Sequence, residues 1–114
     1  MILLMRAFKH PDANEFMLER VLYALSDPVR LDIVRTLGSV AAASCGELDG
    51  GRPKSTMSHH FRVLRESGLV HTECAGTTHM NSLRRAELER RFPGLMDAIL
   101  GLQAVRAADA EALS

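Results

Sequence analysis

The sequence predicts a single, mainly α-helical domain with one small β-hairpin. Among its 114 residues there is no Trp and only 4% are aromatic, while Ala, Leu and Arg are frequent, a composition that favours helices over sheet. Cap and stop residues delimit several segments whose apolar residues recur at helical spacing. One pair of short β-prone runs flanks a Gly-containing turn. A chain of this length supports one hydrophobic core.

The beginning of the chain predicts an N-terminal arm over residues 1–11 and then a first helix. The arm has no helix caps and ends at Pro11. Asp12 can cap the next segment, and Glu15 follows three residues later, as in a capping box. The apolar residues of this helix return at helical spacing: Phe16, Val21, Leu22 and Leu25.

The segment "SDPVRLDIVRTLGS" predicts a second helix that ends at Gly38. Asp27 can cap it, and Pro28 fits the first turn, where its missing N–H costs no hydrogen bond. The residues expected to face the core are Val29, Ile33 and Leu37, widened by Leu31 and Val34. Those expected to face outward are Arg30, Asp32 and Arg35.

A short third helix is predicted near Ser44, and a longer fourth helix over residues 54–67. The connection "DGGRP" between them is rich in Gly and Pro, and Gly68 suits the left-handed conformation that ends many helices. The residues of the fourth helix that face the core are Met57, Phe61 and Leu64. A short helix, a tight connection and a longer helix with a polar face are typical of a helix-turn-helix.

The runs "LVHTEC" and "THMNSL" predict a hairpin around a three-residue turn, Ala75-Gly76-Thr77. This pairing gives one face with His71, Glu73, His79 and Asn81, and another with Val70, Thr72, Cys74, Thr78 and Met80. A hairpin directly after a helix-turn-helix is a wing.

The end of the chain predicts two further helices. One starts at Arg84 and breaks at Pro93, and the last runs from there to about Ala110, leaving residues 111–114 as a tail. The domain over residues 12–110 is therefore expected to be a winged helix-turn-helix with the order α-α-α-α-β-β-α, in which the final α stands for both helices on either side of the break at Pro93.

The outward face of the fourth helix indicates what the domain binds. It carries Ser55, Thr56, Ser58, His59, Arg62 and Arg65. Short hydroxyl and imidazole groups near a helix start can meet base edges in the major groove of double-stranded DNA, and flanking cations can meet phosphates. Residues 52–92 also carry eight Lys or Arg against four Asp or Glu, whereas the segments on both sides are net acidic. A basic middle fits an anionic partner.

Metal binding and catalysis are poorly supported by the same helix. The side chains of His59 and His60 point about 100° apart, so they cannot chelate one ion together. No ligand type stands at the spacing that zinc helices use. No carboxylate, Ser or Cys is placed to pair with either histidine, so we expect no enzyme activity and no cofactor.

Cys45 and Cys74 match no CxxC pattern and do not form a disulfide framework. They could act as a redox switch or as a soft-ion site with His10 from the arm. The alternative is that they are thiols that pack as small apolar groups. Chelation by His71 and His79 with Glu73 is a further alternative to a solvated wing face.

Three segments, "ALSDPVRLDIVRTL", "STMSHHFRVLRESGLV" and "GTTHMNSL", resemble the ArsR/SmtB family of bacterial winged-helix repressors, over roughly residues 15–107. The resemblance implies a homodimer joined through its first and last helices. It also implies a twofold-symmetric operator and repression that a ligand often relieves. The residues that match the family's DNA-contacting positions are Ser55, Thr56, Ser58, His59 and Arg62, and those that match its wing tip are Gly76, Thr77, Thr78 and His79.

The chain departs from the family's metal-sensing motifs. One class of sensor has Cys-Val-Cys in the third helix, where this chain has "SCGEL" with the single Cys45. Another class binds zinc with Asp and His pairs on the last helix, but residues 93–114 contain no His. Neither of these two metal sites is complete, so the family's metal sensing is not carried over to this chain.

The prediction is a sequence-specific DNA-binding transcription regulator that acts as a homodimeric repressor. No apolar run approaches the roughly 18–20 residues of a membrane span, so we expect the protein in the cytoplasm. Any inducer is unidentified. Phosphate contacts are expected from Arg52, Lys54 and Arg62, and base contacts from Thr56, Ser58 and His59. The predicted dimer interface contains Phe16, Leu22, Leu95, Ile99 and Leu102. Two alternatives stay open: a thiol-based metal or redox sensor of the same fold using Cys45 and Cys74, and a protein-interaction module without DNA binding.

Overall fold

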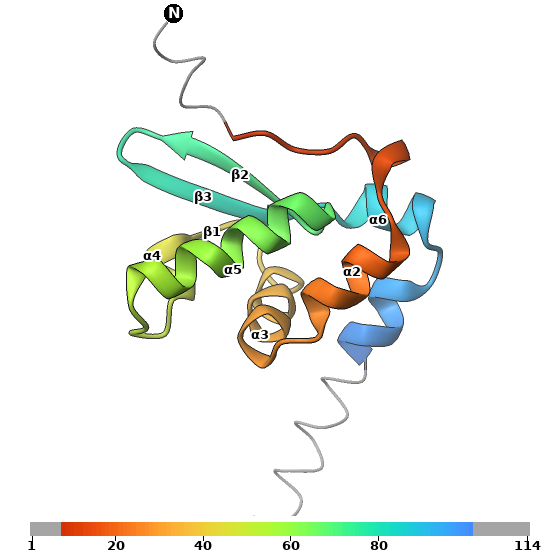
Figure 1. Ribbon diagram of the computed structural model, residues 1–114, viewed down its shortest axis with the longest axis horizontal. Coiled ribbons are helices and arrows are strands. Elements are labelled where there is room, and N and C mark those ends of the chain that lie inside the picture. Colours follow the sequence, from red (N-terminus) through yellow and green to blue (C-terminus); the bar gives the residue numbers. More distant parts are fainter. Residues whose placement is uncertain (1–7, 102–114) are drawn as a thin grey trace, which may run out of the picture.

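The computed structural model describes residues 8–101 of the chain (Figure 1). In chain order the elements are η1 (Ala13–Glu15), α2 (Leu18–Leu25), α3 (Pro28–Leu37), β1 (Ala43–Ser44), α4 (Cys45–Leu48), α5 (Lys54–Ser67), β2 (Val70–Ala75), β3 (Thr78–Leu83) and α6 (Arg85–Arg91), followed by helix over 95–101. The hairpin of β2 and β3 projects at the same end of the molecule as α4 (Figure 1). This order confirms the predicted winged helix-turn-helix.

The predicted first helix is two shorter elements. The backbone N–H of Asp12 donates to Glu15 Oε1 over 2.7 Å, as expected for a capping box, but this box caps only the 3₁₀ turn η1. The chain is extended at Phe16, and α2 starts two residues later. The break turns the Phe16 side chain into the core, where only 1% of it is exposed. There its ring occupies the space that a Cβ at Gly68 would need.

Helix α3 has the predicted cap. The carboxylate of Asp27 accepts the backbone N–H groups of Val29 (2.8 Å) and Arg30 (3.1 Å), and Pro28 occupies the first turn. Burial alone would raise the pKa of Asp27, but these two backbone hydrogen bonds lower it. The helix ends before Gly38, as predicted.

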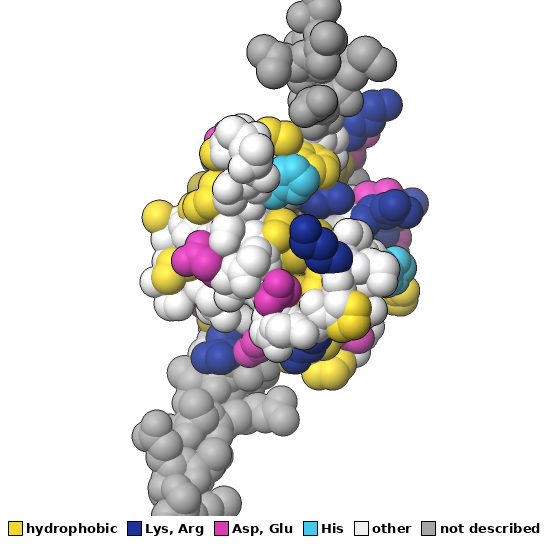
Figure 2. Space-filling view, turned by 90° about the vertical axis from the view of Figure 1, so that its left-hand side faces the viewer, with side chains coloured by type: hydrophobic (Ala, Val, Ile, Leu, Met, Phe, Trp, Pro, Cys, Tyr) yellow, Lys and Arg dark blue, Asp and Glu magenta, His cyan; other side chains and the backbone are white. Residues whose placement is uncertain are grey.

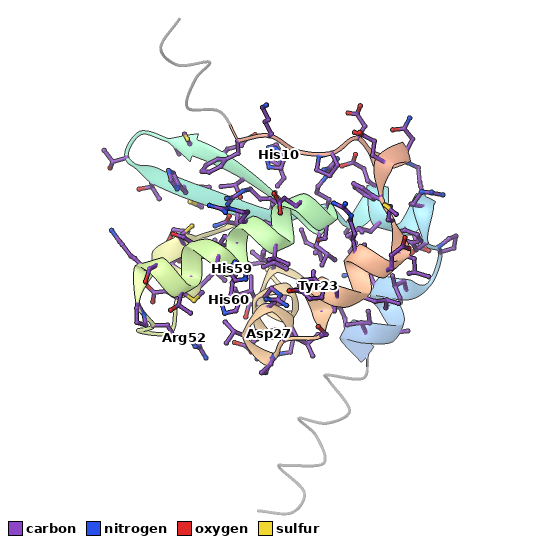
Figure 3. The ribbon with its side chains drawn as sticks, in the orientation of Figure 1. His10, Tyr23, Asp27, Arg52, His59 and His60 are labelled. Carbon is purple, nitrogen blue, oxygen red and sulfur yellow. The ribbon has the colours of Figure 1, made fainter. Side chains whose placement is uncertain are left out.

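Arg30 does not face outward, so that prediction is wrong. Only 5% of the residue is exposed. Its Nε donates to the carbonyl oxygen of Ala24 (2.8 Å) and Nη2 to that of Tyr23 (3.3 Å), while Nη1 lies 3.1 Å from His60 Nδ1. The two carbonyls belong to the last turn of α2, the negative end of its dipole, which stabilises a cation. Figure 3 shows Tyr23, Asp27 and His60 gathered where α2, α3 and α5 meet.

His60 is the partner of this cation on α5. A guanidinium can only donate, so Nδ1 of His60 is an unprotonated acceptor. Burial lowers the pKa of His60, and the nearby Arg30 lowers it further, although Asp27 acts in the opposite direction. His60 is buried, and His59 is exposed, which confirms the predicted outward position of His59.

The two helices of the helix-turn-helix begin and end close to the predicted positions. Ser44 and Glu47 form a capping box at α4, with Glu47 N 3.1 Å from Ser44 Oγ and Ser44 N 2.8 Å from Glu47 Oε1. Helix α5 ends at Gly68, whose φ of 93° is left-handed. Its core-facing side chains are buried as predicted: Met57, Phe61 and Leu64.

The short strand β1 was not predicted. It pairs antiparallel with β3, so that the sheet described by residues 8–101 has three strands in the order β1-β3-β2. Fully buried Asn81 joins them: its Oδ1 accepts the Thr72 hydroxyl (2.7 Å), and its Nδ2 donates to the carbonyl oxygen of Ala43 (3.3 Å). A strand of two residues carries no alternation that a sequence pattern could reveal.

The hairpin has a two-residue turn, Gly76-Thr77, so its predicted register is wrong. Gly76 has a φ of 65°, as the first central position of a type II′ turn requires. The directly opposed residues are Thr72 and Asn81, Glu73 and Met80, Cys74 and His79, and Ala75 and Thr78. His79 and Asn81 therefore share a face with Thr72 and Cys74, while Thr78 and Met80 lie with His71 and Glu73, because shortening the turn by one residue changes which side chains face each other.

The C-terminal helices start and break within two residues of the predicted positions. Arg84 is the N-cap residue of α6, which ends at Arg91, before Phe92 and Pro93, and the next helical segment starts at residue 95. In the next helical segment Met96 is buried, and the predicted interface residues Leu95 and Ile99 are half-buried. Leu102 and the predicted boundary between 110 and 111 lie outside the described residues. Within residues 8–101, no helix combines the length and apolar character needed to cross a membrane.

We predict that Arg30→Ala destabilises the fold by about 2–4 kcal/mol, because two carbonyls and His60 lose a charged donor in the core. The matched control is Arg35→Ala on the same helix, where an exposed ion pair with Asp32 (3.1 Å) contributes less than about 1 kcal/mol. Urea unfolding at one fixed protein concentration measures both. Equal effects of the two substitutions would contradict the role of Arg30.

Candidate nucleic-acid interface

The N-terminal half of α5 presents one polar, exposed face. At about 100° per residue, the five predicted contact residues of this helix cover an arc of roughly 160°, opposite the buried arc. All of them are exposed: Ser55, Thr56, Ser58, His59 and Arg62. Lys54, at the first position of the helix, is exposed as well. The face therefore has short groups near the helix start and a cation one to two turns further on.

The wing tip lies beside this face. Its four residues are exposed: Gly76, Thr77, Thr78 and His79. An open hollow of about 490 Å³ is lined by Thr77, Thr78 and His79 from the wing, by Lys54 and Ser58 from α5, and by residues of α4. The fold thus brings together two groups of predicted contact residues that lie some twenty residues apart in the chain.

Arg52 stands at the edge of the same region. It belongs to the loop between α4 and α5 and is exposed (Figure 3). Its Nη1 donates to the carbonyl oxygen of Asp49 over 3.3 Å, which holds the side chain near the start of α5.

The charge of this end of the molecule is more dispersed than the basic middle of the sequence predicts. Figure 2 looks onto it and shows mainly uncharged polar and backbone atoms, with separated Lys or Arg side chains and several Asp or Glu side chains. Two cations of the basic middle are instead paired near α6: Arg84 with Glu87 (2.8 Å) and Arg85 with Asp97 (2.6 Å). The exposed cations of the helix-turn-helix are Arg52, Lys54 and Arg62.

Arg65 behaves differently from the other outward residues of α5. It is half-buried, and its guanidinium lies 4.3 Å from the centre of the Phe8 ring. Burial lowers the pKa of Arg65. The arm therefore covers part of this cation, whereas the helical period of α5 predicts an exposed side chain.

The cysteines and histidines do not converge on a metal site within residues 8–101. Cys45 is half-buried, with Asn81 Nδ2 donating to its Sγ over 3.3 Å, and Cys74 is exposed on the outer half of β2. The corrected register separates His79 from His71 and Glu73. His10 stacks on His71, and within residues 8–101 it belongs to no group of three or more His, Cys, Asp or Glu side chains that could hold a metal ion.

Sequence reasoning missed two sets of residues that hold this interface in place. Arg30 and His60 fix α5 against α2 and α3. Phe8 and His10 in the arm contact α5 and the wing. The position of Arg30 within the apolar arc of its helix was a usable signal, whereas the arm offers no periodicity.

Comparison with known proteins agrees with this geometry. Residues 25–73 match a family model described as a helix-turn-helix domain. The uncharacterized HTH-type transcriptional regulator YceK of Bacillus subtilis (strain 168) is 39% identical over 83 residues, which cover 70% of this chain and 83% of that protein. The arsenical resistance operon repressor of Staphylococcus xylosus is 34% identical over 73 residues, covering 63% of this chain and 70% of the relative.

A solved structure extends the similarity to three dimensions. The transcriptional repressor BigR from Xylella fastidiosa superposes with a TM-score of 0.60 at 35% identity, covering 79% of this chain and 87% of that one. On its fold and on its identity with these regulators over most of their length, the chain belongs to the ArsR family of winged helix-turn-helix transcriptional regulators.

Proposed function

We propose that the protein is a homodimeric repressor that binds a twofold-symmetric operator with α5 and the wing tip of each protomer. The observation that carries the proposal is the hollow shared by Lys54 and Ser58 of α5 and by Thr77–His79 of the wing. Two of the similar proteins are named as repressors, which supports the same role here. Such a regulator acts where the DNA is, in the cytoplasm of a bacterium.

We assign the proposed DNA contacts by side-chain length, with short side chains on base edges and long cationic side chains on phosphates. Thr56, Ser58 and His59 stand on the first two turns of α5, where short groups can reach base edges in a major groove about 12 Å wide. Arg52, Lys54 and Arg62 flank them and are assigned to phosphates. The wing tip, Gly76 to His79, is assigned to the neighbouring backbone.

Dimerisation is supported by exposed apolar side chains on α2 and just before it. Met17, Leu18, Leu22 and Tyr23 are 43–59% exposed. Together with Leu95 and Ile99 of the last helical segment, they form the proposed interface. Phe16 is withdrawn from it, because this side chain is buried in the core of its own protomer. Two recognition helices on successive turns of DNA, about 34 Å apart, require such a dimer.

The first prediction concerns DNA binding and its salt dependence. Three exposed cations per protomer make six phosphate contacts per dimer, so log K against log salt should have a slope of about −5. Arg62→Ala should reduce the magnitude of this slope by about 2, since the dimer contains two copies. The probe is a duplex selected from a random-sequence pool by the wild-type protein, and the readout is fluorescence anisotropy.

The matched control is Arg90→Ala, which removes the same charge from an exposed position on α6. It should leave the slope unchanged. An equal effect of both substitutions would contradict a local contact by Arg62. Failure of the wild-type protein to enrich any duplex would refute DNA recognition itself.

The second prediction concerns base recognition. His59→Ala should weaken binding to the selected duplex by about 1–3 kcal/mol, while binding to a random duplex of equal length stays unchanged. The two affinities are measured by competition at one salt concentration. A parallel loss on both duplexes would show that His59 contributes only general affinity.

The third prediction concerns the dimer. Leu22→Glu should give a monomer that binds the selected duplex at least about tenfold more weakly, because a buried, unpaired carboxylate opposes association. Val40→Glu is the control, since Val40 is similarly exposed (43%) but lies outside the proposed interface. Sedimentation equilibrium reports the oligomeric state. A dimer of the Leu22 variant, or a monomer of both, would refute this interface.

A further inference from the structure

The described part of the N-terminal arm, residues 8–11, lies along the outer edge of the wing. Strand β2 is at the edge of the sheet, so its outward N–H groups need partners from outside the sheet. One of them, the backbone N–H of Thr72, donates to His10 Nε2 over 3.0 Å. The His10 ring also stacks on the ring of His71, with 4.3 Å between their centres. Figure 1 shows the arm passing the sheet, and Figure 3 shows His10 between them.

Phe8 bridges the wing and the recognition helix. Its ring meets the His79 ring edge-on, with the centres 5.0 Å apart. The guanidinium of Arg65, on α5, lies 4.3 Å from the centre of the same ring. One aromatic side chain of the arm therefore touches the wing tip on one side and α5 on the other.

The C-terminal end of the arm is hydrogen-bonded to the rest of the domain at Pro11. Arg84 donates from Nη1 to the carbonyl oxygen of Pro11 over 2.7 Å. The same guanidinium is held by Glu87, at 2.9 and 2.8 Å, and packs over the Phe16 ring. We call residues 8–11 the strap. Pro11 is held by Arg84, His10 contacts β2, and Phe8 contacts the wing tip and α5.

The wing needs such support because its outer half has little else to hold it. Residues 73–79 are all exposed, whereas Thr72 and Asn81 at the base are buried. Strand β1 pairs with β3 only at Asn81 and Met80. Beyond that point the hairpin is a two-stranded ribbon, which twists more freely than a wider sheet. Its angle to α5 decides whether both can touch one DNA duplex.

We propose that Phe8 and His10 are positioning residues for operator binding, which hold the wing tip at a fixed separation from α5. The proposal rests on the proposed DNA-binding function. Neither residue needs to touch DNA: Phe8 acts through His79 and Arg65, and His10 acts through the backbone of β2.

The contact of His10 requires its unprotonated form, because the N–H of Thr72 can only donate. The pKa of His10 is lowered from its ordinary 6.5 by burial first, and then by His71 on β2, Arg84 before α6 and Arg65 on α5, while a backbone hydrogen bond at Phe8 acts the other way. Glu73 and Glu87 pair with His71 and Arg84 and moderate these charges. The strap is therefore intact above about pH 6.5 and weakens as the pH falls through the lower pKa of the folded state.

The test uses the full chain and the duplex selected by the wild-type protein. Phe8→Ala and His10→Ala should each weaken binding by roughly two- to tenfold, the range of one aromatic contact or hydrogen bond. His10→Gln should bind like wild type near neutral pH, because its amide oxygen can accept the N–H of Thr72. Between about pH 7.5 and pH 5.5 it should also lose less affinity than wild type, since Gln does not titrate.

Asn14→Ala, at an exposed position just after the arm, is the control for affinity, and thermal unfolding checks that each variant folds. A second readout needs no DNA: amide hydrogen exchange at Thr72 should accelerate in His10→Ala and stay protected in His10→Gln. This pattern separates a lost strap from a general loss of stability, which would accelerate exchange throughout the sheet.

Unchanged affinity in both alanine variants overturns the proposal, and so does tighter binding, which would mean that the arm obstructs DNA. These results leave the proposed function standing. If the wild-type protein enriches no duplex, the proposed DNA-binding function is refuted, and the positioning role of Phe8 and His10 is refuted as well.

Discussion

The arrangement of the three main helices depends on one buried cation. Arg30 brings a full charge into the core and has no carboxylate among its hydrogen-bond partners, which would be costly without other compensation. The compensation comes from two carbonyls at the negative end of α2 and from the unprotonated nitrogen of His60. The guanidinium therefore ties α2, α3 and α5 together. Because His60 must point inward to meet it, His59 points outward, and the polar arc of α5 is turned toward solvent.

Residues close to each helix end were sufficient to predict the helices, but the sequence near Arg30 did not predict that this residue is buried. The cap at Asp27, the helix start near Ser44 and the stop at Gly68 depend on residues within a few positions, so the sequence pattern predicts them correctly. On a helical wheel Arg30 lies about 100° from Val29, inside the apolar arc, yet its charge favoured an outward assignment. The carbonyls that stabilise it belong to another helix, and helix propensity contains no information about them.

At the candidate interface, too, features set by neighbouring residues were predicted, and features set by distant contacts were not. The exposed residues of α5 and the wing tip could be predicted, because they follow from one helical period and one turn. The register of the hairpin could not, since a three-residue and a two-residue turn around Gly76 fit the sequence equally well. The arm contacts were also out of reach, because His10 and Thr72 are 62 residues apart and nothing in either segment indicates the other.

The contact between Phe16 and Gly68 has a thermodynamic consequence. Gly68 is the C-cap residue of α5, between this helix and strand β2 of the wing. Phe16 lies just before α2, whose exposed apolar face is the proposed subunit contact. The proposed DNA-binding surface and the proposed subunit contact therefore meet at one joint, the packing of the Phe16 ring on Gly68. On the proposed function, a shift of this joint changes subunit association and operator affinity together, and linkage then requires that each change the other by the same factor.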